Sequence, residues 1–142
     1  MSVLTYDPKK VVVLIGNHRV TGFAEDNMIK IKPNGDGFKT FSAADGEVAR
    51  SVDPNQTFKV TITLSSASKS NDYLSNLHNL DRATGAGMVP LVVKDLGGTT
   101  NFIAAQAWVV NYPEKSLGRS IDTQDWEIDT GRVDAVVIGG ND

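Results

Sequence analysis

The sequence contains no cysteine, which excludes disulfide bonds and thiolate metal sites. It has only two histidines, and His18 and His78 lie too far apart to form a histidine metal motif. The longest apolar run, residues 11–15, is much too short to cross a bilayer as a helix. The first eight residues lack the basic start and apolar core of a signal peptide. We therefore expect no contact with a membrane.

An excess of basic residues is also missing. The chain has 14 lysines and arginines against 17 aspartates and glutamates, for a formal net charge of −3. Sequence-independent binding to nucleic acid needs a basic face that displaces counterions from phosphates. The glycine pairs lack the Gly-Lys-Ser/Thr of a phosphate loop, and no serine lies in a Gly-x-Ser-x-Gly motif. The sequence therefore predicts a protein that is not an enzyme and holds no cofactor.

What the chain does contain is a series of short strands. At 142 residues and 40% hydrophobic content, it is predicted to form one domain over residues 1–142. Alternating or β-branched segments predict strands. These cover residues 9–15, 20–24, 28–32, 38–43, 47–52, 56–65, 88–95, 102–111, 125–130 and 134–138. The expected fold is mainly β (α+β), a sandwich or barrel of about eight to ten strands with one packed α-helix.

The helix is predicted near residues 70–83. Ser70 or Asn71 is expected to cap its N-terminus, and Gly85 or Gly87 to end it. A narrow apolar stripe at helical spacing is expected to pack against the core. It consists of Tyr73, Leu74, Leu77 and Leu80.

The predicted strand at 102–111 is apolar on both faces, which is typical of a strand covered on both sides. The only tryptophans, Trp108 and Trp126, fall on faces that look buried. This argues against an exposed aromatic platform for sugars.

A projecting hairpin is predicted near residues 34–52. Its two strands flank Asp45 and Gly46, a dipeptide that strongly favours a hairpin turn. The hairpin has few apolar residues, and a two-stranded sheet with so little to bury is not expected to be stable alone. One interpretation is that it projects and is buried against a neighbouring molecule. The other is an ordinary surface hairpin.

An acidic row lies in the predicted strand at 125–130. Alternation places Asp125, Glu127 and Asp129 on one strand face, about 7 Å apart. Four interpretations stay open, namely a solvated outer face, a metal site, a carboxylate pair for glycoside hydrolysis, and an acidic wall facing a channel.

Several motifs in this order resemble the tail tube proteins of contractile-tailed bacteriophages, and the resemblance covers essentially the whole chain. They are Gly16, Phe23, Asp45-Gly46-Glu47 with Arg50-Ser51, Thr61-Ile62-Thr63-Leu64, and Ser68 with Ser70-Asn71-Asp72 and Leu74. The resemblance implies hexameric rings that stack into a hollow conduit for DNA ejection inside a contractile sheath. It also implies a subunit of the virion tail that is assembled in the bacterial cytoplasm. Implied partners are further copies, the sheath, and baseplate, tail-completion and tape-measure proteins.

The resemblance also assigns candidate surfaces. The hairpin would reach the adjacent ring through Phe38, Phe41, Asp45, Gly46, Glu47 and Arg50. Asp122, Asp125, Glu127 and Asp129 are candidates to line an acidic lumen, through which DNA would pass without specific binding. Six copies at −3 would give a ring a charge of −18. The alternatives are a tube subunit of another contractile injection or secretion system, a carbohydrate-binding β-sandwich, and a small hydrolase.

Overall fold

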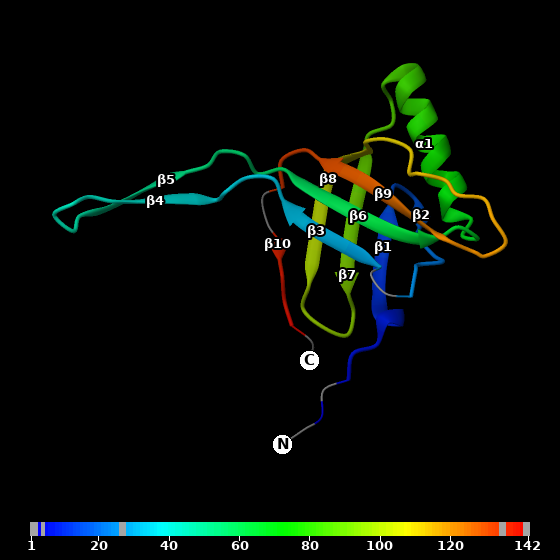
Figure 1. Ribbon diagram of the computed structural model, residues 1–142, viewed down its shortest axis with the longest axis horizontal. Coiled ribbons are helices and arrows are strands. Elements are labelled where there is room, and N and C mark those ends of the chain that lie inside the picture. The colour runs from blue at the N-terminus through cyan, green and yellow to red at the C-terminus, as the bar shows by residue number, and fades with distance from the viewer. Residues whose placement is uncertain (1–2, 4, 26–27, 134–135, 141–142) are drawn as a thin grey trace.

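A computed structural model describes residues 3, 5–25, 28–133 and 136–140 (Figure 1). These residues form ten strands, one α-helix and one short 3-10 helix. In chain order the elements are η1 (Pro8–Lys10), β1 (Val11–Ile15), β2 (His18–Arg19), β3 (Ile29–Pro33), β4 (Phe38–Ser42), β5 (Val48–Val52), β6 (Phe58–Ser65), α1 (Ser70–Thr84), β7 (Val89–Asp95), β8 (Asn101–Val109), β9 (Thr123–Thr130) and β10 (Val136–Val137). The predicted mainly-β class with one α-helix is confirmed.

Eight of the strands form one open antiparallel sheet. Its order is β2-β1-β7-β8-β9-β6-β3, and β10 pairs with β8 beside this path. The remaining strands, β4 and β5, form a separate two-stranded sheet that extends away from the rest of the molecule (Figure 1). Because the main sheet does not close, β3 ends it with a free edge.

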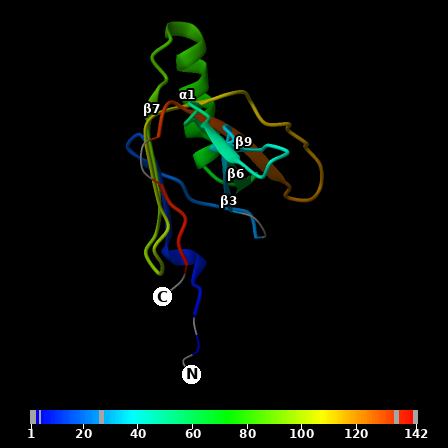
Figure 2. The same ribbon diagram turned by 90° about the vertical axis from the view of Figure 1, so that its left-hand side faces the viewer.

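A bulge in β8 allows the sheet to bend into two layers. Leu91 pairs with Ala104 but Val89 pairs with Ala107, so β8 contains one residue more than its partner between these pairs. Figure 2 shows β7 on one side and β6 with β9 on the other, with α1 above them.

The core lies between these layers. Val60, Ile62 and Leu64 of β6 are fully buried, as their alternation predicts, and Trp126 and Ile128 of β9 join them. The other layer contributes buried residues from β1, β7 and β8, and α1 adds two leucines. These are Val13, Ile15, Leu91, Val93, Phe102, Ala104, Ala107, Val109, Leu74 and Leu77.

The start of α1 differs from the prediction. Neither Ser70 nor Asn71 is the N-cap, because Lys69 occupies that position and its side chain makes no capping bond. Ser70 is buried instead, and its Oγ accepts a hydrogen bond from Thr21 N and lies 2.8 Å from His18 Nε2. The Ser70 hydroxyl group, which was predicted to cap the helix, therefore contacts His18 and Thr21 instead.

The end of α1 agrees with the prediction, since the helix stops at Gly85 in a left-handed conformation with φ of 73°. Within the apolar stripe, Leu74 and Leu77 are buried but Leu80 is 47% exposed. The last turns of α1 extend beyond the sheet (Figure 1), so the prediction that Leu80 packs in the core is wrong.

Two strand predictions are also wrong. Residues 20–24 do not form a strand, and Phe23 makes only an isolated bridge to Leu64. Gly22 turns this segment with a φ of 75°, and it passes so close to Ser68 that a Cβ at Gly22 would lie 2.5 Å from the Ser68 Cβ.

The strand β8 is not covered on both faces within one chain, because its outward-facing Ile103 is 47% exposed. The predicted strand at 134–138 begins at residues 134 and 135, which lie outside the described residues.

Candidate functional site: an exposed hairpin and a charged sheet face

Both strands of the β4–β5 hairpin lie outside the core. Every residue of β4 and β5 is exposed. Phe38 pairs with Val52 and Ser42 with Val48, so the strands are in regular antiparallel register. The hairpin is therefore a regular two-stranded element with no residue in the core of its own chain.

The turn of the hairpin is built by three residues, 44–46. Gly46 N donates to Ala43 O at 3.0 Å, and the Glu47 amide donates to Asp45 Oδ1 at 3.1 Å. Gly46 takes a φ of 92°, as expected for the left-handed residue that follows a tight turn in a three-residue hairpin loop. Asp45, Gly46 and Glu47 thus fix the tip of the hairpin by local geometry.

Apolar side chains lie along the exposed strands. Phe38 is 53% exposed and Phe41 is 55% exposed, and Val48 and Val52 are more exposed still. The Arg50 guanidinium lies 4.3 Å above the centre of the Phe38 ring, in a cation–π contact. Large apolar side chains gathered on an exposed element are typical of a contact surface.

Asp53 holds the base of the hairpin. Its carboxylate accepts hydrogen bonds from the Asp36 amide at 2.8 Å and the Asn55 amide at 3.0 Å. These two bonds hold the pKa of Asp53 below its ordinary value; desolvation opposes them, and the Lys39 charge adds the weakest lowering effect. The base of the hairpin is thus fixed by polar contacts instead of core packing.

Three of the four candidate acidic residues share the outer face of β9. Asp125, Glu127 and Asp129 alternate with buried residues of the same strand. Asp125 Oδ1 accepts from Thr63 Oγ1 at 2.8 Å, and Glu127 Oε2 lies 3.8 Å from Lys59 Nζ. Asp122 stands apart in the loop before β9, where its Oδ1 accepts from the Thr123 amide.

Three lysines share this face, and the sequence analysis did not identify them as part of the site. Pairing places Lys59 of β6 opposite Asp129, and Lys32 of β3 opposite Lys59. In the next row, Lys30 lies opposite Thr61, which lies opposite Glu127. Directly opposed residues project from the same face. This charged face of β3, β6 and β9 therefore balances three lysines against three carboxylates.

The described residues contain no group of three histidine, aspartate or glutamate side chains placed to hold a metal ion. On the charged face, Asp125 contacts a hydroxyl group and Glu127 an ammonium group, whereas Asp129 Oδ1 is buried with no hydrogen-bond partner among the described residues. The alternation of Lys30 and Lys32 is visible in the sequence, but their register against β6 and β9 is not.

Residues 16–139 match the family model of the bacteriophage PhiTE tail tube protein. The chain belongs to this family. A curated relative agrees: the tail tube chain is 30% identical over 132 residues to structural protein ORF10 of Pseudomonas phage KPP10, covering 87% of this chain and 76% of that protein.

Solved structures support the fold. The tail tube chain is similar to a chain of the sheath–tube complex of the PVC extracellular contractile injection system in its extended state, with a TM-score of 0.57 and 12% identity over 97% of this chain and 93% of the other. It is also similar to the tube-terminating cap of the anti-feeding prophage, with a TM-score of 0.56 and 12% identity over 100% and 95% of the two chains.

The predicted resemblance to phage tail tube proteins is thus confirmed. The tail tube chain is a structural protein of the phage tail, and its family is not enzymatic. Among the described residues, none of the helices has the length and apolar character needed to cross a membrane.

Proposed function

We propose that this tail tube protein closes into rings of six copies, which stack into a hollow tube that conducts DNA inside a contractile sheath. The observation that carries the proposal is the β4–β5 hairpin, which is ordered but buries none of its apolar residues within its own chain. Such a surface becomes stable when another molecule covers it.

The open sheet supports ring formation. The edge strand β3 presents unpaired backbone groups along Ile29–Pro33, and exposed edges of this kind invite pairing with another chain. A head-to-tail contact between edges of successive copies closes into a ring when the rotation per copy permits. In that arrangement the sheets of neighbouring copies become continuous.

We assign the charged face of β3, β6 and β9 to the lumen. It carries Asp125, Glu127 and Asp129 together with three lysines, so it offers DNA no net positive charge to bind. Asp122 lies apart from this face, in the loop before β9, and is a further candidate for the lumen wall. The helix α1 then belongs to the outer wall, where the sheath would contact it. Baseplate, tail-completion and tape-measure proteins would meet the tube ends or interior after assembly in the host cytoplasm.

A second candidate function is the tube of another contractile injection system. The fold similarity to the PVC and anti-feeding prophage chains favours it. It shares ring stacking with the first proposal and differs in what passes through the tube.

Negative-stain electron microscopy of the purified chain tests the proposal, alone and after addition of isolated baseplates from the same phage as nucleators. We expect six-fold rings or hollow tubes in at least one of these conditions. A protein that stays monomeric at high concentration in both would contradict it. Sedimentation velocity provides the matching measurement of size in solution.

A further inference from the structure

An asparagine–glycine pair lies where the chain leaves β3 for the β4–β5 hairpin (Figure 1). Asn34 follows Pro33, the last residue of β3, and it is the one asparagine of the sequence that precedes a glycine. Asn34 is exposed and lies outside the helices and strands. Asparagine side chains are among the chemically labile groups of proteins. A following glycine leaves the neighbouring backbone nitrogen unhindered, because glycine has no Cβ.

The backbone nitrogen of Gly35 is free to react. Among the residues that the structure describes, none accepts a hydrogen bond from the Gly35 amide. At the tip of the hairpin, by contrast, Gly46 follows Asp45 and its amide donates to Ala43 O at 3.0 Å. The structure therefore distinguishes the pair at residues 34 and 35 from the chemically related pair at the tip.

Packing requires a glycine at position 35. A Cβ at Gly35 would lie 2.3 Å from the Asn55 carbonyl oxygen, which is closer than side chains approach backbone atoms in folded proteins. A larger residue, which would hinder the backbone nitrogen, therefore does not fit without a shift of the backbone. The fold thus keeps the neighbour that makes Asn34 most reactive.

We infer that Asn34 is a site of spontaneous deamidation, which converts it to isoaspartate and aspartate. The Gly35 nitrogen loses its proton and attacks Asn34 Cγ, and the side-chain nitrogen leaves as ammonia. The cyclic succinimide that results takes up one water. Opening at the main-chain carbonyl carbon gives isoaspartate, and opening at Cγ gives aspartate. The net reaction consumes one water and releases one ammonia, so it needs no enzyme and no other reactant.

One hydrogen bond restrains the reacting amide. Asn34 Nδ2 donates to Thr57 Oγ1 at 3.1 Å, and the Asn34 backbone amide donates to Thr57 O at 3.0 Å. The first bond holds the leaving group, and the second holds only the backbone. Removing the Thr57 hydroxyl should therefore speed the reaction.

Both products change the base of the hairpin. Each carries a carboxylate at position 34, close in the chain to Asp36, whose amide donates to Asp53 Oδ2 at 2.8 Å. The new charge repels the Asp53 carboxylate. Isoaspartate also adds one carbon atom to the main chain between β3 and the hairpin. The reaction takes place in the free subunit, so the inference does not depend on the proposed tube.

Peptide mapping by mass spectrometry, after long incubation of the folded chain in mildly alkaline buffer, tests the inference. We expect Asn34 to react about tenfold faster than every other asparagine, since none of these precedes a glycine. A protein isoaspartate methyltransferase should label the peptide that contains residue 34. In Asn34→Gln the label should be lost, because the longer side chain must close a larger ring.

A second variant tests the restraint by Thr57. Thr57→Val keeps the shape of the side chain without its hydroxyl, and we expect it to speed the deamidation of Asn34 about fivefold, as the loss of one neutral hydrogen bond implies. The matched control is Thr63→Val, which removes a hydroxyl that contacts Asp125 instead, and it should leave the rate unchanged. Circular dichroism of each variant establishes that the chain is folded.

Three results would contradict this account. If Asn34 reacts no faster than the other asparagines, the inference is wrong. A methyl label that is unchanged in Asn34→Gln would come from Asp36, which also precedes a glycine, and would overturn the assignment to Asn34. Equal rates in Thr57→Val and Thr63→Val would refute the restraint by Thr57.

Discussion

At the scale of single residues, Asn71 joins three elements through one side chain. Its Oδ1 accepts hydrogen bonds from Trp126 Nε1 at 2.8 Å and from Gln124 Nε2 at 2.9 Å. Its Nδ2 donates to the carbonyl oxygens of Ser65 and Ser68, both at 2.9 Å. The side chain therefore ties the first turn of α1 to β9 and to the end of β6. This contact explains why Asn71 does not cap the helix.

Replacing this side chain should cost much of the stability of the subunit. We expect Asn71→Ala to lower the free energy of unfolding by roughly 3 kcal/mol, because two buried donors on β9 lose their acceptor. Urea unfolding of the monomer measures this change. The matched control, Asn76→Ala on the exposed face of the same helix, should change stability by less than about 0.5 kcal/mol. Equal effects of the two variants would show that the Asn71 network contributes nothing.

At the scale of elements, the strands with a strict alternation could be predicted from the sequence. In β6 and β9, burial follows the period of two residue by residue. The predictions fail where the local structure depends on backbone geometry or on a contact with a residue far away in the sequence. Gly22 turns the segment that was expected to be a strand, and Ser70 lies against His18, which is 52 positions earlier in the chain.

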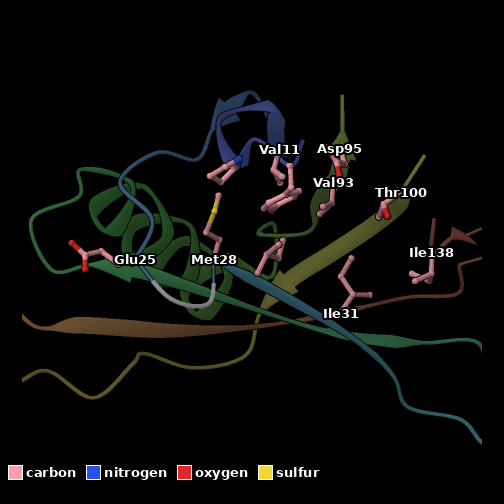
Figure 3. A pocket seen from close by; sticks show the side chains of 11 residues that line it. Val11, Glu25, Met28, Ile31, Val93, Asp95, Thr100 and Ile138 are labelled. Atoms are coloured by element: carbon pink, nitrogen blue, oxygen red, sulfur yellow. The ribbon is translucent and has the colours of Figure 1, made fainter. Parts of the chain in front are cut away.

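In the candidate site, too, the features that depend on neighbouring residues could be predicted, and those that depend on distant residues could not. The turn chemistry of Asp45 and Gly46 locates the tip of the hairpin, because it depends on neighbouring residues alone. The pairing of Lys59 with Asp129 depends on the register of strands about 70 residues apart, which no local pattern contains. A groove between the two layers of the sheet (Figure 3) is lined by residues from both ends of the chain, such as Val11 and Ile138, and was not predicted.

The base of the hairpin should respond to acid through Asp53. Two amide hydrogen bonds to its carboxylate hold the pKa of Asp53 in the folded chain below its unfolded value near 3.8. This stabilisation is therefore complete above the unfolded pKa and is lost as the pH falls through the lower, folded pKa. We expect the amide NMR resonances of Asp36 and Asn55 to shift together, with a midpoint below 3.8. A midpoint at or above 3.8 would contradict the arrangement, and Asp53→Asn should abolish the shared transition.

At the scale of the whole molecule, the proposal that the charged face lines the lumen has a consequence for DNA in the tube. Three lysines and three carboxylates leave this face without net charge, while the chain as a whole carries −3. A wall of this kind neither traps phosphates nor excludes them strongly. The acidic residues are therefore needed to offset the lysines that β3 and β6 contribute, more than to create a strongly negative channel.

This balance predicts the effect of reversing two charges. Asp125→Lys with Glu127→Lys adds four positive charges to each copy of the face, so phosphates should bind there in a salt-dependent manner. We expect tails isolated after ejection to retain nuclease-protected DNA when they carry this pair, and to release it as salt is raised. The control, Asp72→Lys with Glu114→Lys, makes the same change in net charge at exposed positions outside the charged face. If tails with either pair of substitutions retain equal amounts of protected DNA, the face of β3, β6 and β9 does not line the lumen. The two pairs change the net charge equally and differ only in whether they lie on this face.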